Sequence, residues 1–253
     1  MKKLLLFITV ALLSVSMSSC LDMGSQKYSE TSIVYISQHQ GRMYGKTLSG
    51  RIITSEKMQI MPPRSFKIFH FSWDESYGYT PIGEAQADNV IIAGEPIDLP
   101  STVVMDITAP EEAPEYRFSG ILSPAHDPYG KFFDDFWLFE YKHEALEGER
   151  FNLEFYTRDY SAGENTVSIE IRLNRIAPAE ENAVKKEYVN IVAADLGSLR
   201  SRYLGPSNEE LKIKFYYHID GNDEPMVIKT PDYKDYYEMI NTSDELKPNP
   251  NSY

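Results

Sequence analysis

The sequence has little cysteine, a deficit of positive charge and few histidines. One cysteine in 253 residues excludes an internal disulfide and a cysteine-rich zinc or iron–sulfur site. Lys and Arg number 25 against 38 Asp and Glu, so a chain of net charge −13 repels phosphate backbones, and nucleic acid is not an expected partner. The 5 histidines lack metal-ligand spacing, and neither a GxSxG nor an HExxH motif occurs. We expect no metal, no cofactor and no enzyme activity.

Long hydrophobic runs are also scarce, and the informative one lies at the N-terminus. Lys2 and Lys3 precede the apolar stretch Leu4–Val15, which then leads through small residues to Cys20. The stretch is too short to cross ~30 Å of hydrocarbon as a helix and is typical of a signal peptide. With Cys20 at its end, it resembles a bacterial lipoprotein signal; an ordinary cleaved signal is the alternative.

This resemblance implies a membrane anchor. Residues 1–19 would be removed as the signal peptide, and Cys20 would carry the lipid. Several acyl chains hold a protein at a bilayer without a transmembrane helix. We therefore expect a chain attached to the outer membrane through Cys20, on either its periplasmic or its surface face.

Most of the remaining chain has the apolar–polar alternation or the β-branched and aromatic runs that predict strands. A polar tether occupies residues 20–31, and the proline-flanked acidic segment Ala109–Pro114 predicts a domain boundary. We therefore expect an all-β protein with domains at 32–109 and 115–240 and a flexible tail at 241–253. The strand candidates are Ser32–Ile36, Arg51–Thr54, Phe66–Trp73, Thr102–Thr108, Phe132–Tyr141, Phe151–Phe155, Val167–Leu173, Tyr188–Ala194 and Leu211–Tyr217. A short helix is expected at Asp232–Ile240.

Two segments resemble functional motifs at first sight. Gly41–Thr47 has three residues between its glycines where a phosphate-binding loop needs four, which favours a strand with a tight turn. His126-Asp127, close to Asp134 and Asp135, is the nearest approach to an acid–base or metal cluster, but acids beside glycine and proline usually cap turns. A hydrolase using Asp134 or Asp135 is the enzyme alternative, and it needs a second carboxylate across a cleft.

Aromatic residues are abundant, with 18 Tyr, 12 Phe and 2 Trp. Most of them are expected to fill pleated sheets. Trp73, Tyr77 and Tyr79 fall in a predicted loop after an apolar strand, where packing gives them less reason to be aromatic. They are the candidate ligand-contact surface.

Two groups of segments carry a family resemblance. Gly41–Ile53 with Phe66–Phe71, and then Phe136–Tyr141, His143, Val167–Asn174 and Val189–Leu199, are similar to NigD-like lipoproteins of Gram-negative anaerobes. The resemblance implies a small OB-like barrel followed by a β-sandwich, and it implies no catalytic residues.

The leading hypothesis is a non-enzymatic, lipid-anchored envelope protein that acts as a binding or scaffold module for an unknown protein or glycan. A bacteriocin-immunity-type lipoprotein is the second hypothesis, because an acidic body attracts a basic partner. A glycan-binding accessory lipoprotein that uses Trp73, Tyr77 and Tyr79 is the third.

Overall fold

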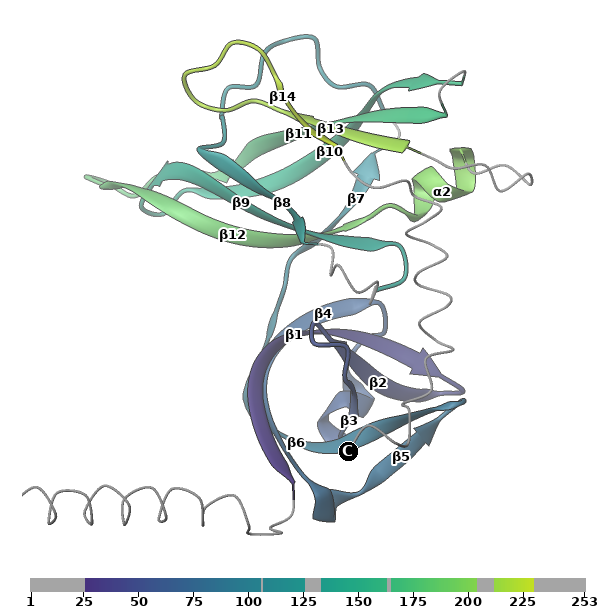
Figure 1. Ribbon diagram of the computed structural model, residues 1–253. Helices are drawn as coiled ribbons and strands as arrows, with labels where there is room; N and C mark the ends of the chain where they lie inside the picture. Colours follow the sequence, from purple (N-terminus) through teal and green to yellow (C-terminus); the bar gives the residue numbers. More distant parts are fainter. Residues whose placement is uncertain (1–25, 106, 126–132, 163–164, 204–211, 230–253) are drawn as a thin grey trace, which may run out of the picture.

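The computed structural model describes residues 26–105, 107–125, 133–162, 165–203 and 212–229. Strands dominate and form a six-stranded and an eight-stranded sheet, which lie one above the other in Figure 1. The predicted all-β class is confirmed. In this described part of the chain, no helix is long and apolar enough to cross a membrane. Cys20, the signal peptide, the His126-Asp127 pair, the predicted helix Asp232–Ile240 and the tail 241–253 lie outside the described residues.

The first sheet closes into a barrel. Its strand β1 pairs antiparallel with β2 and β4, and β3 closes the ring by pairing parallel with β6. The short helix η1 lies between β3 and β4, and β5 extends the sheet as a hairpin with β6. This order confirms the OB-like barrel. The elements are β1 (Lys27–His39), β2 (Arg42–Thr47), β3 (Ile52–Thr54), η1 (Glu56–Ile60), β4 (Ser65–Asp74), η2 (Glu75–Tyr77), β5 (Tyr79–Ile82) and β6 (Ala85–Asp98).

Strand β1 is buried on both faces, which explains its uninterrupted apolar run. Val34 and Ile36 enter the barrel core, whereas Ile33 and Tyr35 on the opposite face pack toward the second domain. Successive side chains of a strand point to opposite faces, so a strand covered on both sides loses its polar positions.

The segment that resembles a phosphate loop is a hairpin. Gln40 and Gly41 turn the chain with positive φ angles of 47° and 83°, and β2 follows directly. Gly45 on β2 allows η1 to pack against the barrel core. A Cβ there would lie 2.4 Å from Val34 Cγ1 and 2.6 Å from Met58 Cε.

The second sheet has the order β14-β13-β11-β10-β7-β12-β9-β8 and curls so that its two halves pack face to face. Phe139 on β9 meets Phe155 on β10 and Phe215 on β13, with ring centroids 5.1 and 5.0 Å away. The halves therefore pack as the expected β-sandwich does. The elements are β7 (Ser101–Met105), β8 (Gly120–Ala125), β9 (Phe136–Leu146), β10 (Arg150–Ser161), β11 (Thr166–Ala177), β12 (Lys185–Asp195), α2 (Gly197–Tyr203), β13 (Lys212–Tyr217) and β14 (Met226–Lys229).

Two predicted boundaries differ from the structure. The pattern places Thr102–Thr108 in the first domain, but β7 pairs parallel with β10 and β12 and is the central strand of the second sheet. The chain therefore passes between the domains at Leu99 and Pro100. The predicted tether is also too long, because β1 begins at Lys27, where it pairs with Asp74. Local pattern misses both boundaries because the pairing partners lie far along the chain.

The two domains share a buried aromatic cluster. Tyr35 and Phe66 from the barrel pack against Phe133 and Phe136 from the second domain, with ring centroids 5.2–5.8 Å apart across the junction. The buried Tyr35 hydroxyl donates a hydrogen bond to the carboxylate of Asp134 across the junction. The domains are thus joined by packing as well as by the connecting chain.

Candidate functional site

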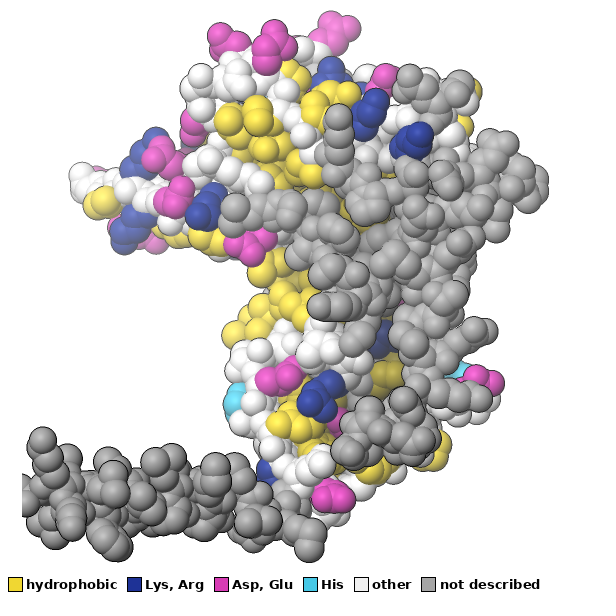
Figure 2. Space-filling model, in the orientation of Figure 1, with side chains coloured by type: hydrophobic (Ala, Val, Ile, Leu, Met, Phe, Trp, Pro, Cys, Tyr) yellow, Lys and Arg dark blue, Asp and Glu magenta, His cyan; other side chains and the backbone are white. Residues whose placement is uncertain are grey.

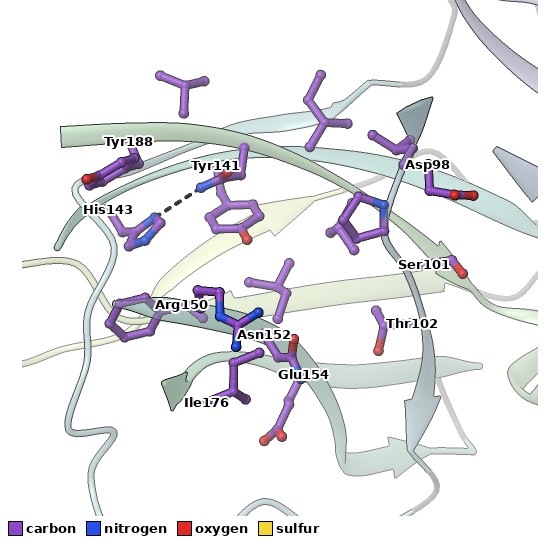
Figure 3. A pocket seen from close by; sticks show the side chains of 18 of the residues that line it. Asp98, Ser101, Thr102, Tyr141, His143, Arg150, Asn152, Glu154, Ile176 and Tyr188 are labelled. Carbon is purple, nitrogen blue, oxygen red and sulfur yellow. Dashed lines mark hydrogen bonds between the residues drawn. The ribbon is translucent and has the colours of Figure 1, made fainter. Parts of the chain in front are cut away.

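The principal cavity of the described chain lies in the second domain, between β10 and β12. This interstrand cleft has a volume of about 740 Å³, within the range typical of ligand sites. Figure 3 shows β12 along one side of it, β10 along the other and the start of β7 at one end. Most of its lining comes from Asp98–Val103, Glu149–Glu154 and Tyr188–Val192, with Tyr141, His143 and Ile176.

The cleft forms because β7 is short. Strand β12 pairs with β7 through Ala193–Asp195, and β10 pairs with it through Phe155 and Tyr156. Before these positions β10 and β12 diverge, with β11 and β9 paired to their far edges. Two strand edges therefore face each other across a space that β7 borders at one end through Ser101–Val103.

His143 forms the inner wall of the cleft and is surrounded by aromatic rings. Its ring stacks on Tyr141 and Tyr188 at centroid distances of 5.7 and 5.9 Å and forms a T-shaped pair with Phe151 at a centroid distance of 5.0 Å. Its Nδ1 lies 3.5 Å from the Asn190 side-chain nitrogen (Figure 3). Burial lowers the pKa of His143 below its ordinary value of 6.5, against the opposing effect of the Glu149 carboxylate. At pH 7 the imidazole is therefore uncharged, and it packs among the aromatic rings as part of the cleft wall.

Carboxylates predominate among the charged groups of the cleft. Glu149 accepts hydrogen bonds from the Leu146 backbone nitrogen at 2.8 Å and from Arg175 at 3.1 Å, and these contacts lower its pKa. Glu154 accepts from the Tyr156 hydroxyl at 2.6 Å and from the Asn174 amide at 2.9 Å. These carboxylates are fixed in position by partners, which suits them to orient a ligand.

Apolar side chains reach the surface around the cleft. Ile176 and Val189 are 51% and 54% exposed, and Val103 is 60% exposed. Figure 2 shows hydrophobic side chains at the surface where the barrel meets the second domain, with charges of both signs on the second domain above. An exposed apolar rim around a concave site is typical of an interaction surface.

The aromatic residues predicted from the sequence lie on the barrel and do not line this cleft. Trp73 is only 5% exposed because it is the last residue but one of β4 and enters the barrel core, where it stacks on Tyr28 at 5.2 Å. The prediction that places it in a loop is therefore wrong. Tyr77 and Tyr79 are 40% and 48% exposed, and Tyr79 lies 5.9 Å from Trp73. These two tyrosines stay a predicted contact surface.

The acids considered for hydrolysis have structural contacts. Asp134 accepts the hydrogen bond from Tyr35, and the Asp135 carbonyl accepts one from the Leu196 backbone nitrogen at 2.9 Å. Neither residue lines the interstrand cleft. Within the described ranges, no group of three His, Cys, Asp or Glu side chains is placed to hold a metal ion.

A second polar cluster lies under the connector between β7 and β8. The buried Glu170 carboxylate lies 2.6 Å from Arg172, 3.7 Å from Arg158 and 3.9 Å from His218. Arg172 also donates to the carbonyls of Pro110 and Glu112 at 2.6 and 2.8 Å. These hydrogen bonds of Arg172 hold the connector against the sheet.

Sequence reasoning did not single out the cleft residues. His143, Tyr188 and Asn190 are adjacent only because β9 and β12 pair in one register. The available signal was weak: Ile176 and Val189 are apolar at positions where alternation predicts polar, solvent-facing side chains.

Comparison with known proteins identifies the fold. No protein-family model matches the chain, and no curated protein does. A candidate lipoprotein from Bacteroides fragilis NCTC 9343 has a similar structure, with a TM-score of 0.56 and 8% identity over 81% of this chain and 96% of that one. An uncharacterized protein from Parabacteroides merdae ATCC 43184 gives 0.51 and 10% over 80% and 96%. A NigD-like immunity protein from Bacteroides caccae ATCC 43185 gives 0.47 and 11% over 80% and 92%.

At these identities the likeness concerns the fold. The shared region covers the barrel and the curled sheet together, so the two-domain arrangement itself recurs in proteins of this bacterial group. The all-β fold, with a closed barrel followed by a curled sheet, is the architecture that the sequence resemblance implies.

Proposed function

We propose that this chain is a non-enzymatic binding protein of the bacterial cell envelope, related to NigD-like lipoproteins and anchored to the outer membrane through lipid on Cys20. The observation that carries the binding role is the interstrand cleft, a concave site with an apolar rim and fixed polar groups. Its histidine stacks on aromatic rings, and the nearby Glu149 carboxylate is held by the Leu146 backbone nitrogen and by Arg175. The site is therefore built to hold a ligand.

The envelope location is supported by the start of the sequence and by the fold. The apolar stretch Leu4–Val15 ends close to Cys20, and the Bacteroides fragilis structure of similar fold is a candidate lipoprotein. The net charge of −13 makes attraction to anionic headgroups a poor means of attachment, which supports lipid on Cys20 as the proposed anchor.

Metabolic labelling with an alkyne fatty acid tests the anchor. The wild-type chain is expected to incorporate the label and to sediment with membranes, and Cys20→Ala is expected to lose both properties. Unchanged labelling of Cys20→Ala would remove the lipid anchor from the proposal.

The same cells test the binding role. A photocrosslinking amino acid at Ile176 in the cleft is expected to give a light-dependent adduct, and the same probe at Ile91 on the barrel is expected to give none. Both isoleucines lie on strands and are similarly exposed, at 51% and 55%. Equal adduct formation at the two positions, or none at Ile176, would contradict binding at the cleft.

A further inference from the structure

The lining of the interstrand cleft shows that it runs along strand edges. The consecutive residues Glu149–Glu154 all line it, and so do the consecutive residues Tyr188–Val192. Successive side chains of a strand point to opposite faces of a sheet. A cavity that touches every residue in a row therefore lies beside the strand, where the backbone N–H and C=O groups point.

These two edges lack a neighbouring strand within the described residues. The register of β10 with β7 begins at Phe155, and that of β12 with β7 begins at Ala193. Edges such as these are templates for strand pairing, and proteins usually cover them or protect them with inward charges, proline or bulges. In this sheet β7 lies between β10 and β12. The space between these two strands begins beside the start of β7, and no strand of the described chain fills it.

The chemistry of the cleft defines what can occupy it. Two facing rows of peptide groups require alternating donors and acceptors on both sides, which an extended polypeptide supplies. Ile176 and Val189 offer apolar contacts at the rim. The charged lining has the carboxylates of Asp98, Glu149 and Glu154 and the guanidinium of Arg150. Lys67 and Arg175 pair with Asp98 and Glu149, whereas Glu154 accepts from the neutral Tyr156 hydroxyl and Asn174 amide. The charge of Glu154 and the net charge of −13 on the whole chain favour a cationic partner.

We infer that the interstrand cleft binds an extended, cationic segment of a partner protein, which adds as a strand between β10 and β12 and completes the sheet beyond β7. This inference rests on the proposed binding function and names the ligand class of the same site. Backbone pairing with Arg150–Glu154 and Tyr188–Val192 supplies affinity, and the rim side chains select apolar residues between basic ones.

Panning a phage-displayed library of random dodecapeptides against the full-length lipidated chain in detergent tests the inference. The expected enriched peptides alternate apolar with Lys or Arg residues and contain no proline within the core of the motif. A synthetic peptide of that sequence is expected to bind at least tenfold more weakly to Ile176→Asp and equally well to Ile91→Asp, the control at matched exposure. Its affinity is also expected to fall with added salt.

Amide hydrogen exchange gives a readout that side-chain binding alone would not produce. The bound peptide is expected to slow exchange along residues 150–154 and 188–192 together, and N-methylation of alternate peptide amides is expected to abolish binding. Absence of any enriched peptide would overturn the inference. So would peptide binding without protection of both edges, or concentration-dependent dimerisation that Ile176→Asp removes, since the occupant would then be a second copy. If any of these results occurs together with a light-dependent adduct at Ile176, the proposed binding function still holds and only the ligand class is wrong.

Discussion

His143 joins the packing of the cleft to the pH dependence of the fold. It lies among Tyr141, Tyr188 and Phe151, and burial lowers its pKa below 6.5. The unfolded chain therefore takes up a proton at this position at a higher pH than the folded chain does. The contribution of this shift to the free energy of unfolding is fully present above pH 6.5, and it is lost as the pH falls toward the pKa of His143 in the folded chain. Burial lowers the pKa of His218 in the same direction.

We expect His143→Phe to keep the aromatic packing and to remove part of this acid sensitivity. The decrease in the urea midpoint between pH 7 and pH 5 should be smaller in the variant than in the wild type, with the remainder due to other groups such as His218. His70→Phe, at an exposed position on β4, serves as the control and should keep the wild-type decrease. A His143→Phe variant with an unchanged pH profile would refute this account.

At the scale of elements, the packing of η1 against β2 requires that Gly45 has no side chain. A Cβ on Gly45 would lie 2.4 Å from Val34 and 2.6 Å from Met58, so the barrel core would have to shift to admit it. Overpacking of this kind usually costs about 1–3 kcal/mol of unfolding free energy. Gly120 on β8 has open space around its Cβ position.

Gly45→Ala is therefore expected to destabilise the protein by about 1–3 kcal/mol, whereas Gly120→Ala should leave its stability unchanged or slightly higher. Urea denaturation of the two variants measures the difference. Equal stabilities would show that η1 can move away from β2 at no cost.

How much of each element the sequence predicts depends on where its partners lie. The alternation in Phe151–Phe155 and Val167–Leu173 predicts β10 and β11 because the apolar side chains of each strand enter the shared core. The polar positions Ser168 and Glu170 of β11 are nevertheless buried as well. The uninterrupted run in β1 is also readable as a strand, although its two-sided burial is not. The position of β7 and the interstrand cleft are unpredictable locally, since both result from pairing between Ser101–Met105 and strands much further along the chain.

The candidate site shows the same division. Trp73 is conspicuous in the sequence but is a core residue, whereas the cleft is built from common residues such as Asn190 and Ile176. An aromatic side chain beside a turn predicts exposure only when the strand has ended, and β4 runs through Asp74. A cleft between strand edges is a property of backbone pairing, for which no residue type is diagnostic.

On the scale of the whole molecule, the aromatic cluster at the junction should make the two domains unfold together. Phe66 contacts Phe133 and Phe136 at centroid distances of 5.2 and 5.3 Å and is 1% exposed. Trp73 lies in the barrel core and Trp137 in the core of the second domain, so each domain contains its own fluorescent reporter.

We expect the single-tryptophan variants Trp73→Phe and Trp137→Phe to give coincident urea transitions, because each then reports the other domain in a coupled molecule. Adding Phe66→Ala to both should separate the transitions, with a loss of about 3–5 kcal/mol from the buried ring. Transitions that are already separate with Phe66 in place would show that the junction does not couple the domains.

The central place of β7 has a kinetic consequence. Ser101–Val103 pair with Ala193–Asp195, and Val104 pairs with Phe155, so the strand in the middle of the sheet is the first of that sheet to be synthesised and among the last to be secured. Native pairings of such high contact order make folding slow, because chain entropy is lost before the pairing compensates for it. As the chain emerges from its N-terminus, β7 thus has no paired neighbour until β10 has followed and only one until β12 has followed, and during that interval its unpaired edge is open to aggregation.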